Sequence, residues 1–420
     1  MKWLLMLAVR SAWNRRLTLG MTLVAVALSV TLLLGVERVR HEARSSFALS
    51  VSGTDLVVGA RTSAVQLMLY AVFRLGEASN NIRWQSYLAV AENPAVAWAI
   101  PLSLGDSHHG LPVLGTTAAY FEHFRYGDGQ PLAFAAGAPF SGLFDAVLGA
   151  EVAERLSYSL GDRIVISHGM GDVGLAEHDD KPFTVVGILA RTGTPVDRTL
   201  HVSLEAINAI HLDWAGGAPL PGLSIPPEHV RKFDLRPKEI TAALVGLKNR
   251  AAVFRVQRQI NNYPDEPLLA VLPGVALDQL WQMVGLAERT LLAVSAMVVV
   301  VGLAGLVAVI LASLGERRRE LAILRSVGAR PGELFLLLSA EALFVTVLGA
   351  LLGVALLALL TALLAPLVQA HFGLSLQAQW VSADELRLLA AVVAAGLLAS
   401  LAPGYSAYRL SLADGLTPRL

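Results

Sequence analysis

The sequence predicts an α+β membrane protein with four transmembrane helices and a large α+β domain between the first two. Three observations predict this class. The 420 residues are 55% hydrophobic, with a mean hydropathy of +0.57, and only 16% are charged, against about 25% in soluble domains. Four apolar stretches reach the length of about 20 residues that a membrane helix needs. Strand and helix patterns alternate between the first two stretches, which indicates a folded mixed domain.

Arginine and lysine asymmetry predicts the orientation of these helices. Four basic residues and no acid precede Leu17, and five arginines lie between residues 315 and 333. No lysine or arginine occurs between residues 366 and 385. Both termini and the arginine-rich segment are therefore expected in the cytoplasm, and the large domain outside.

The chain then divides into eight segments. They are residues 1–37, a cytoplasmic amphipathic leader with transmembrane helix 1; 38–285, the external domain; 286–314, helix 2; 315–333, a cytoplasmic helix; 334–365, helix 3; 366–385, a short external loop; 386–402, helix 4; and 403–420, a cytoplasmic tail.

Within the external domain, alternation and β-branched residues predict strands over residues 162–168, 181–189 and 239–248. Helices are expected in "GAEVAERLSYSLGD", in "NRAAVFRVQRQINNY" and after the capping residue Ser203. Proline and glycine between Trp214 and Pro237 indicate a loop-like insertion.

Composition excludes several kinds of chemistry. The formal net charge is zero, so nothing favours a nucleic-acid partner. The chain has no cysteine, which excludes disulfides, thiolate zinc sites and cysteine nucleophiles. It also has no Gly-Lys dipeptide and therefore no phosphate-binding loop of the form G-x-x-x-x-G-K-[ST]. We expect no catalytic residues, no enzyme activity and no directly bound cofactor.

The segment "GERRRELAILRSVGARPGE", residues 315–333, predicts a short amphipathic helix between helices 2 and 3. Leu321 and Leu324 lie on one helical face, and Gly328 and Pro331 end the helix. We expect these leucines to insert into a groove of a partner protein, with charged side chains at its rim. The alternative is that the arginines only anchor the membrane topology. The expected contact residues are Glu316, Arg317, Arg318, Arg319, Glu320, Leu321, Leu324, Arg325 and Gly328.

Polar residues elsewhere are weaker candidates. Glu341 lies one to two turns inside helix 3, and is either a functional intramembrane charge or an interfacial glutamate paired with an arginine. The segment "HGMGDVGLAEHDD" collects imidazoles and carboxylates, which are ligands of zinc. His168, His178, Asp179 and Asp180 are therefore candidate metal ligands, although a solvated loop explains this polar, glycine-rich segment better, since it has no H-E-x-x-H spacing.

The stretch "GERRRELAILRSVGARPGELFLLLSAEALFVTVLGALLGVALL" resembles the signature of MacB/LolC/FtsX-like permeases, the membrane subunits of mechanotransmitting (type VII) ABC transporters. The matching positions are Glu316–Glu320, Ala322–Arg325, Gly328, Ala329, Glu341, Gly349 and Gly353. The basic leader, the segment "FTVVGILARTGTPVDRTLHVSLEAI" and the tail "APGYSAYRLSLADGL" are also similar to the family. The tail departs from the family pattern at Leu412, where proline is usual.

This resemblance implies a periplasmic domain of the MacB core type and a multi-pass protein of the inner membrane. It implies a separate ABC ATPase subunit that carries ATP and Mg²⁺, a second permease copy in a homodimer, and a periplasmic adaptor or lipoprotein as a further partner. The implied function is transmission of ATP-driven motion to the periplasmic domain, for export or extraction of a cargo. A signalling scaffold like FtsX, or a component of a metal-handling ABC system, is the alternative.

Overall fold

The helices and strands belong to two units, and the computed structural model describes residues 16–169, 178–215, 218–220, 225–316, 318–326, 328–372 and 381–409. One unit combines residues 1–42 with 285–420, and the other is residues 43–284. The expected leader helix and the cytoplasmic tail beyond Arg409 lie outside the described residues. The two units are described separately below.

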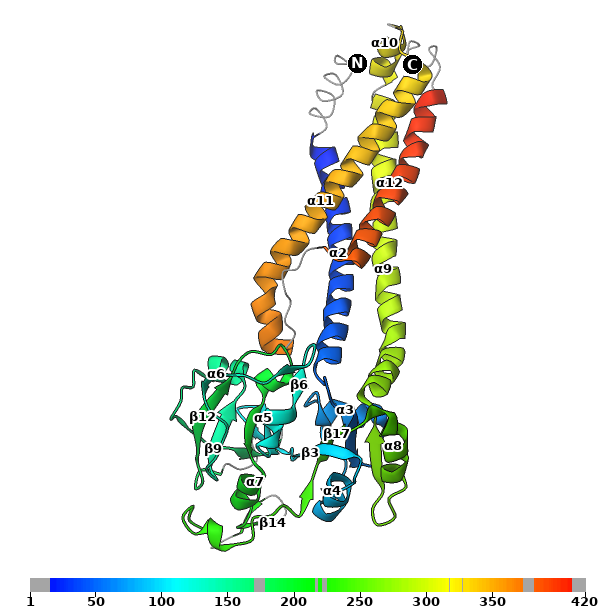
Figure 1. Cartoon of the computed structure of the whole chain (residues 1–420). Coiled ribbons are helices and arrows are strands. Elements are labelled where there is room, and N and C mark those ends of the chain that lie inside the picture. Colours follow the sequence, from blue (N-terminus) through cyan, green and yellow to red (C-terminus); the bar gives the residue numbers. More distant parts are fainter. Residues whose placement is uncertain are drawn as a thin grey trace. The chain divides into compact units, whose positions relative to one another are not determined.

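In its described residues the first unit contains four long helices and one short one (Figure 1), and residues 43–49 and 273–284 of two of these helices belong to the other unit. The helices are α2 (Arg16–Leu49), α9 (Pro273–Glu316), α10 (Arg318–Ser326), α11 (Pro331–Phe372) and α12 (Ala383–Arg409). Each long helix contains a stretch that is apolar and long enough to cross a membrane, which confirms the four predicted transmembrane helices. The helices run further than expected: α9 begins at Pro273 rather than at residue 286, and α11 continues to Phe372 rather than ending at residue 365.

Close approach of α2 to α11 fixes the packing of this unit. A Cβ atom on Gly353 would lie 2.8 Å from the Ala27 carbonyl oxygen and 2.8 Å from the Val30 Cβ. The Thr31 hydroxyl donates to the Gly353 carbonyl across the same contact, at 3.0 Å. Small residues allow such close contacts between membrane helices, and interhelical hydrogen bonds add to them.

The described residues of the external unit form two larger sheets and three two-stranded ones. The four-stranded sheet has the order β18-β1-β17-β3 and is antiparallel throughout. The other has eight strands, in the order β10-β12-β9-β13-β5-β4-β11 with β8 beside β12, and mixes parallel and antiparallel pairs. This arrangement, with its helices, confirms the predicted α+β class.

The four-stranded sheet consists of β1 (Leu56–Ala60), β3 (Val96–Leu102), β17 (Ala242–Leu247) and β18 (Leu268–Val271). The eight-stranded sheet consists of β4 (Asp106–His108), β5 (Leu111–Thr116), β8 (Phe134–Gly137), β9 (Asp145–Leu148), β10 (Arg163–Ile164), β11 (Ser167–His168), β12 (Phe183–Leu189) and β13 (Leu200–Ser203). Short two-stranded pairs join β2 (Ile82–Arg83) to β16 (Glu239–Ile240), β6 (Arg125–Tyr126) to β7 (Gln130–Pro131), and β14 (Trp214–Ala215) to β15 (Ala218–Pro219). The helices are α3 (Ala64–Ala71), α4 (Trp84–Ala91), α5 (Ala119–His123), α6 (Ala150–Leu156), α7 (Leu204–Ile210) and α8 (Val253–Asn261), with short 3₁₀ turns η1 (Pro195–Arg198), η2 (Val230–Lys232) and η3 (Arg250–Ala252).

A shared hydrophobic core joins the two sheets. Its buried members include residues of β1, β3, β17 and β18 in one sheet, of β5, β9 and β12 in the other, and of the helices α3 and α5. The Ser203 hydroxyl accepts a hydrogen bond from the Ala206 amide at 3.1 Å, which confirms the predicted cap of α7. The predicted strand over residues 162–168 forms as two short strands, β10 and β11, which pair with different partners.

A buried ion pair stabilises the segment that precedes β12. Lys181 is completely buried, and its Nζ lies 2.9 Å from both carboxylate oxygens of Asp213, which is itself only 3% exposed. Asp213 also accepts the Ile225 amide hydrogen at 2.9 Å, and Asp180 contacts the same Nζ at 2.5 Å. The pair therefore holds the start of β12 next to the turn that follows α7.

The close approach of α2 to α11 predicts opposite effects of two Gly→Ala changes. Gly353→Ala should lower the melting temperature of the full chain in detergent, because overpacking costs about 1–3 kcal/mol. Gly305→Ala is the matched control, since its Cβ would meet no atom within 4 Å, and alanine gains about 1 kcal/mol in helix propensity. Circular dichroism at 222 nm measures both. An equal rise in the melting temperature of the two variants would contradict the close packing of α2 against α11.

The buried ion pair predicts a large effect of Lys181→Met, which leaves the Asp213 carboxylate buried without its counter-charge. Breaking such a pair costs about 3–5 kcal/mol, and the double change to K181M/D213N should recover part of this loss. Arg236→Met removes the exposed ion pair with Asp234 and should leave the melting temperature unchanged. Tryptophan fluorescence during heating measures all three. Equal melting temperatures for K181M and R236M would rule out a stabilising role for the buried pair.

Candidate functional site

The first candidate site is the helix α10 and the turn that joins it to α11. The α10 helix ends in a Schellman motif, in which the Ala329 amide donates to the Leu324 carbonyl at 3.0 Å and the Gly328 amide donates to the Arg325 carbonyl at 3.1 Å. Gly328 has a φ of +105°, a conformation that glycine adopts readily. The predicted helix end at Gly328 is therefore correct.

A cap then starts α11 immediately. Pro331 is its first residue, and the Glu333 carboxylate accepts the Arg330 amide hydrogen at 3.0 Å. Proline is favoured at this position because the first amide of a helix has no intrahelical partner. The Schellman motif and the cap of α11 leave only residues 327–330 between the two helices, so this short connection restricts the direction of α10 relative to α11.

Leu321 and Leu324, which were expected to insert into a partner, are covered by the chain's own helical unit, and their insertion into a partner stays a prediction. They are only 2% and 8% exposed, and they pack in the core of the chain's own helical unit. Their spacing of three residues places both on one helical face, and that face contacts the core that contains Leu314 and Leu338. The exposed apolar side chain of α10 is Ile323, at 59%.

The structure describes the charged residues between 316 and 325 to different extents. Arg317 lies outside the described residues, and only the backbone is described for Glu316, Arg318, Arg319 and Glu320, all of which are helical. Arg325 is half-buried and Gly328 is exposed. The expectation that these residues contact a partner therefore stays a prediction.

Glu341 lies on α11 and is half-buried. It stands two and a half to three turns beyond the start of that helix at Pro331. Whether it acts as a functional charge also stays a prediction.

A network of charges that the sequence analysis missed joins α2 to α9 and α12. Arg38 forms a bidentate ion pair with Glu385, at 2.9 and 3.2 Å, and Glu385 is almost fully buried. On α2, Glu37 binds Arg40 at 2.6 and 3.0 Å, and Arg40 lies 3.9 Å from Glu288 of α9. Bidentate, poorly solvated pairs of this kind specify the geometry of a contact.

Glu385 has a second role at the start of α12. Its carboxylate accepts the Ser382 amide hydrogen at 2.8 Å, and the Ser382 hydroxyl accepts the Glu385 amide hydrogen at 3.1 Å. This is a capping box. The sequence signal S-x-x-E at residues 382–385 could have located this helix start.

The histidine-bearing segments come together only in part. His168 and His178 lie in one cluster with Asp106 and His211, whereas Asp179 is exposed and Asp180 contacts Lys181. The hydrogen bond between His168 and Asp106 raises the pKa of His168. Asp106 and His211 were not predicted, because they lie 72 and 33 residues away from His178 in the sequence.

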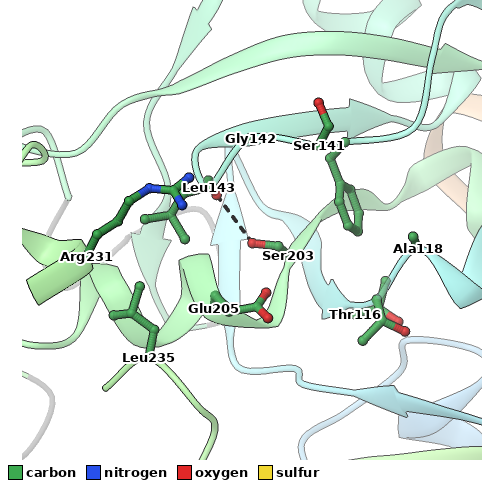
Figure 2. A pocket seen from close by; sticks show the side chains of 11 residues that line it. Thr116, Ala118, Ser141, Gly142, Leu143, Ser203, Glu205, Arg231 and Leu235 are labelled. Atoms are coloured by element: carbon green, nitrogen blue, oxygen red, sulfur yellow. Dashed lines mark hydrogen bonds between the residues drawn. The ribbon is translucent and has the colours of Figure 1, made fainter. Parts of the chain in front are cut away.

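A further hollow in the external unit has a volume of about 390 Å³. Figure 2 shows its lining, to which α7 contributes Glu205 and η2 contributes Arg231. The Ser203 hydroxyl donates to the Leu143 carbonyl at 3.3 Å on its wall. Glu205 and Arg231 are both exposed, and the recess has no buried charged group that would select a ligand.

The chain was compared with known protein families and structures. Residues 18–263, more than half of the chain, match the family model of the MacB-like periplasmic core domain, and residues 292–412 match that of the FtsX-like permease C-terminal region. No curated protein matches the chain.

Two solved structures are similar to the external unit. One is the periplasmic region of MacB from Actinobacillus actinomycetemcomitans, with 9% identity and a TM-score of 0.34, over 56% of this chain and 94% of that one. The other is the extracellular domain of the noncanonic ABC-type transporter YknZ from Gram-positive bacteria, with 12% identity and a TM-score of 0.30, over 52% of this chain and 99% of that one.

The two family models follow one another along the chain in the order of the predicted segments. The expected resemblance is therefore confirmed, and the chain belongs to the MacB/FtsX-like ABC permeases, multi-pass membrane proteins with a MacB-like periplasmic core domain.

Proposed function

We propose that this permease is an inner-membrane subunit that transmits the motion of a separate ABC ATPase to its periplasmic domain. The observation that carries the proposal is the packing of α10. Its buried face lies in the same core as α9 and α11, so a force applied to α10 displaces these helices rather than a free loop.

Unbroken helices support the second half of the proposal. The α9 helix comprises 44 residues, or about 66 Å at 1.5 Å per residue. It starts within residues that belong to the external unit and ends next to α10. The α2 helix also crosses the boundary between the units. A continuous hydrogen-bonded helix transmits displacement along its axis with little change in its own length.

The proposed partners follow from this role. ATP and Mg²⁺ bind to the ATPase subunit, which contacts the exposed side of α10 and the charged residues before it. A second copy of the permease completes a homodimer, and a periplasmic adaptor or lipoprotein delivers or receives the cargo.

Signalling without transport is the second use of the same motion, and one experiment separates the two. The full chain is purified from its native host together with the ABC ATPase and any periplasmic protein that it retains. A retained cargo protein or adaptor supports transport, whereas a retained cell-wall hydrolase supports signalling. Recovery without any ABC ATPase contradicts the proposed function.

The exposure of Ile323 predicts which residue of α10 contacts the ATPase. Ile323→Ala should reduce ATPase co-purification and stimulated ATP turnover while leaving the melting temperature of the permease unchanged, because the side chain is exposed in this chain. Burial of one such side chain at an interface is worth about 1.5–3 kcal/mol, or roughly tenfold or more in affinity.

Leu321→Ala is the matched comparison. It should lower the melting temperature by creating a cavity worth about 2–5 kcal/mol. If Leu321→Ala weakens the ATPase complex without affecting stability, and Ile323→Ala does neither, the proposed orientation of α10 is wrong.

A further inference from the structure

Four side chains of the external unit form a cluster with the composition of a transition-metal site. Asp106, His168, His178 and His211 each offer one ligand atom, and these four atoms all lie within 4.8 Å of one another. Imidazole suits Zn²⁺, Co²⁺ and Ni²⁺, whereas Ca²⁺ and Mg²⁺ prefer sites built from oxygen ligands. A set of three imidazoles and one carboxylate therefore selects for a borderline-soft divalent ion.

The fold brings these side chains together from separate elements. Asp106 and His168 are directly opposite each other in the antiparallel pair of β4 and β11, a position where side chains on one face meet. His211 is the C-cap residue of α7. The His178 amide donates to the Ile166 carbonyl at 2.9 Å, which ties His178 to the strand segment that leads into β11.

The distances suit a tetrahedral ion. His168 Nδ1 lies 3.1 Å from His211 Nε2 and 3.1 Å from Asp106 Oδ1, and His211 Nε2 lies 3.6 Å from the same oxygen. Bonds of about 2.0–2.1 Å from Zn²⁺ to nitrogen place tetrahedral ligands roughly 3.3–3.4 Å apart. These three atoms therefore need to move by only a few tenths of an ångström.

His211 is already oriented for ligation. Its Nδ1 lies 2.7 Å from the Ile207 carbonyl oxygen, so Nδ1–H donates to that oxygen and Nε2 keeps its lone pair. A hydrogen bond of this type to the second ring nitrogen is usual for histidines that bind metal. The neighbouring buried pair of Lys181 and Asp213 holds the turn that follows His211.

The burial of His178 is not explained by hydrogen bonding. The side chain is completely buried, and neither of its ring nitrogens has a hydrogen-bond partner in the part of the chain that the structure describes. A buried polar group without a partner costs about 1–3 kcal/mol, and a metal ion in the cluster would provide the missing partner.

His108 shows the contrasting arrangement. It is also buried, but its Nδ1 lies 2.6 Å from the Val165 carbonyl oxygen and its Nε2 lies 3.0 Å from the Tyr158 hydroxyl. Both of its nitrogens are therefore occupied within the fold. The difference between the two histidines separates a ligand from a structural residue.

We propose that Asp106, His168, His178 and His211 bind one divalent transition-metal ion, with Zn²⁺ the best match to the ligand set. Asp106 and His178 form the buried base of the site, whereas His168 and His211 are about 30% exposed and leave an entry path. The site does not depend on the proposed transmission of motion, since it needs only the external unit.

Trp214 provides a local reporter. Its ring centroid lies 4.0 Å from that of His178 and within 6 Å of those of His168 and His211. Co²⁺ in the cluster should therefore quench the fluorescence of Trp214 and show the visible absorption of a tetrahedral Co²⁺ site. Trp214→Phe should keep that absorption and lose the quenching.

The test uses the full chain in detergent, without a histidine tag, stripped with a chelator and titrated with Co²⁺ and then Zn²⁺. We expect one ion per chain, displacement of Co²⁺ by Zn²⁺, and a melting temperature that rises with Zn²⁺. Asp106→Asn and His178→Phe should each weaken binding by at least about 100-fold, since partners outside the ligand shell alone change affinity by 10–100-fold.

His178→Phe also separates ligation from packing. Because it removes a buried polar ring without a partner, the metal-free variant should melt at the same temperature as the original chain or higher, while the response to Zn²⁺ disappears. His229→Gln, which changes an exposed histidine, should bind metal normally.

The proposal fails if the original chain binds no stoichiometric Co²⁺, or if Asp106→Asn and His178→Phe bind it as the original chain does. It also fails if His178→Phe destabilises the metal-free chain and leaves Co²⁺ binding intact, which would make His178 a packing residue. If either variant does not fold, the comparison of the original chain with Trp214→Phe decides: quenching that persists without Trp214 places the ion elsewhere.

Discussion

The contact between α2 and α11 at Gly353 is the constraint on which the helical unit depends. Lipid supplies no hydrophobic force between helices, so their association relies on close packing and on polar contacts across the interface. At Gly353 the lack of a side chain allows both, since the backbones approach closely and the Thr31 hydroxyl reaches the Gly353 carbonyl oxygen and donates a hydrogen bond to it. A side chain there would separate the helices, and the core that also holds α10 would lose its shape.

The burial of Leu321 and Leu324 depends on the same core. The sequence analysis could predict α10 and its C-terminal end, because the Schellman glycine and the proline that follows it are local signals. It could not decide what the apolar face of α10 covers, because a helical stripe has the same pattern whether it packs against the chain itself or against a partner. The four membrane helices were predictable because the length and composition of apolar stretches specify them, and the α+β class was predictable because strand and helix patterns alternate between the first two stretches.

The cluster of Asp106, His168, His178 and His211 was predictable only in part, because two of its members come from distant parts of the sequence. His168 and His178 were recognisable as candidates because they lie in one segment, but Asp179 is exposed and Asp180 binds Lys181, so neither belongs to the cluster. Asp106 and His211 reach the cluster through strand pairing and through the position of a helix end, and neither has a local signature. The unpartnered nitrogens of His178 become apparent only when the fold places them.

The shared carboxylate of Glu385 limits how α12 can move. Its two oxygens bind Arg38 of α2, and one of them, Oε2, also accepts the Ser382 amide hydrogen at the start of α12. Sliding α12 along α2 by one turn, about 5.4 Å, would break the ion pair and either expose the cap or leave a buried charge without its counter-ion. The contacts of Glu385 therefore fix the position of α12 along α2.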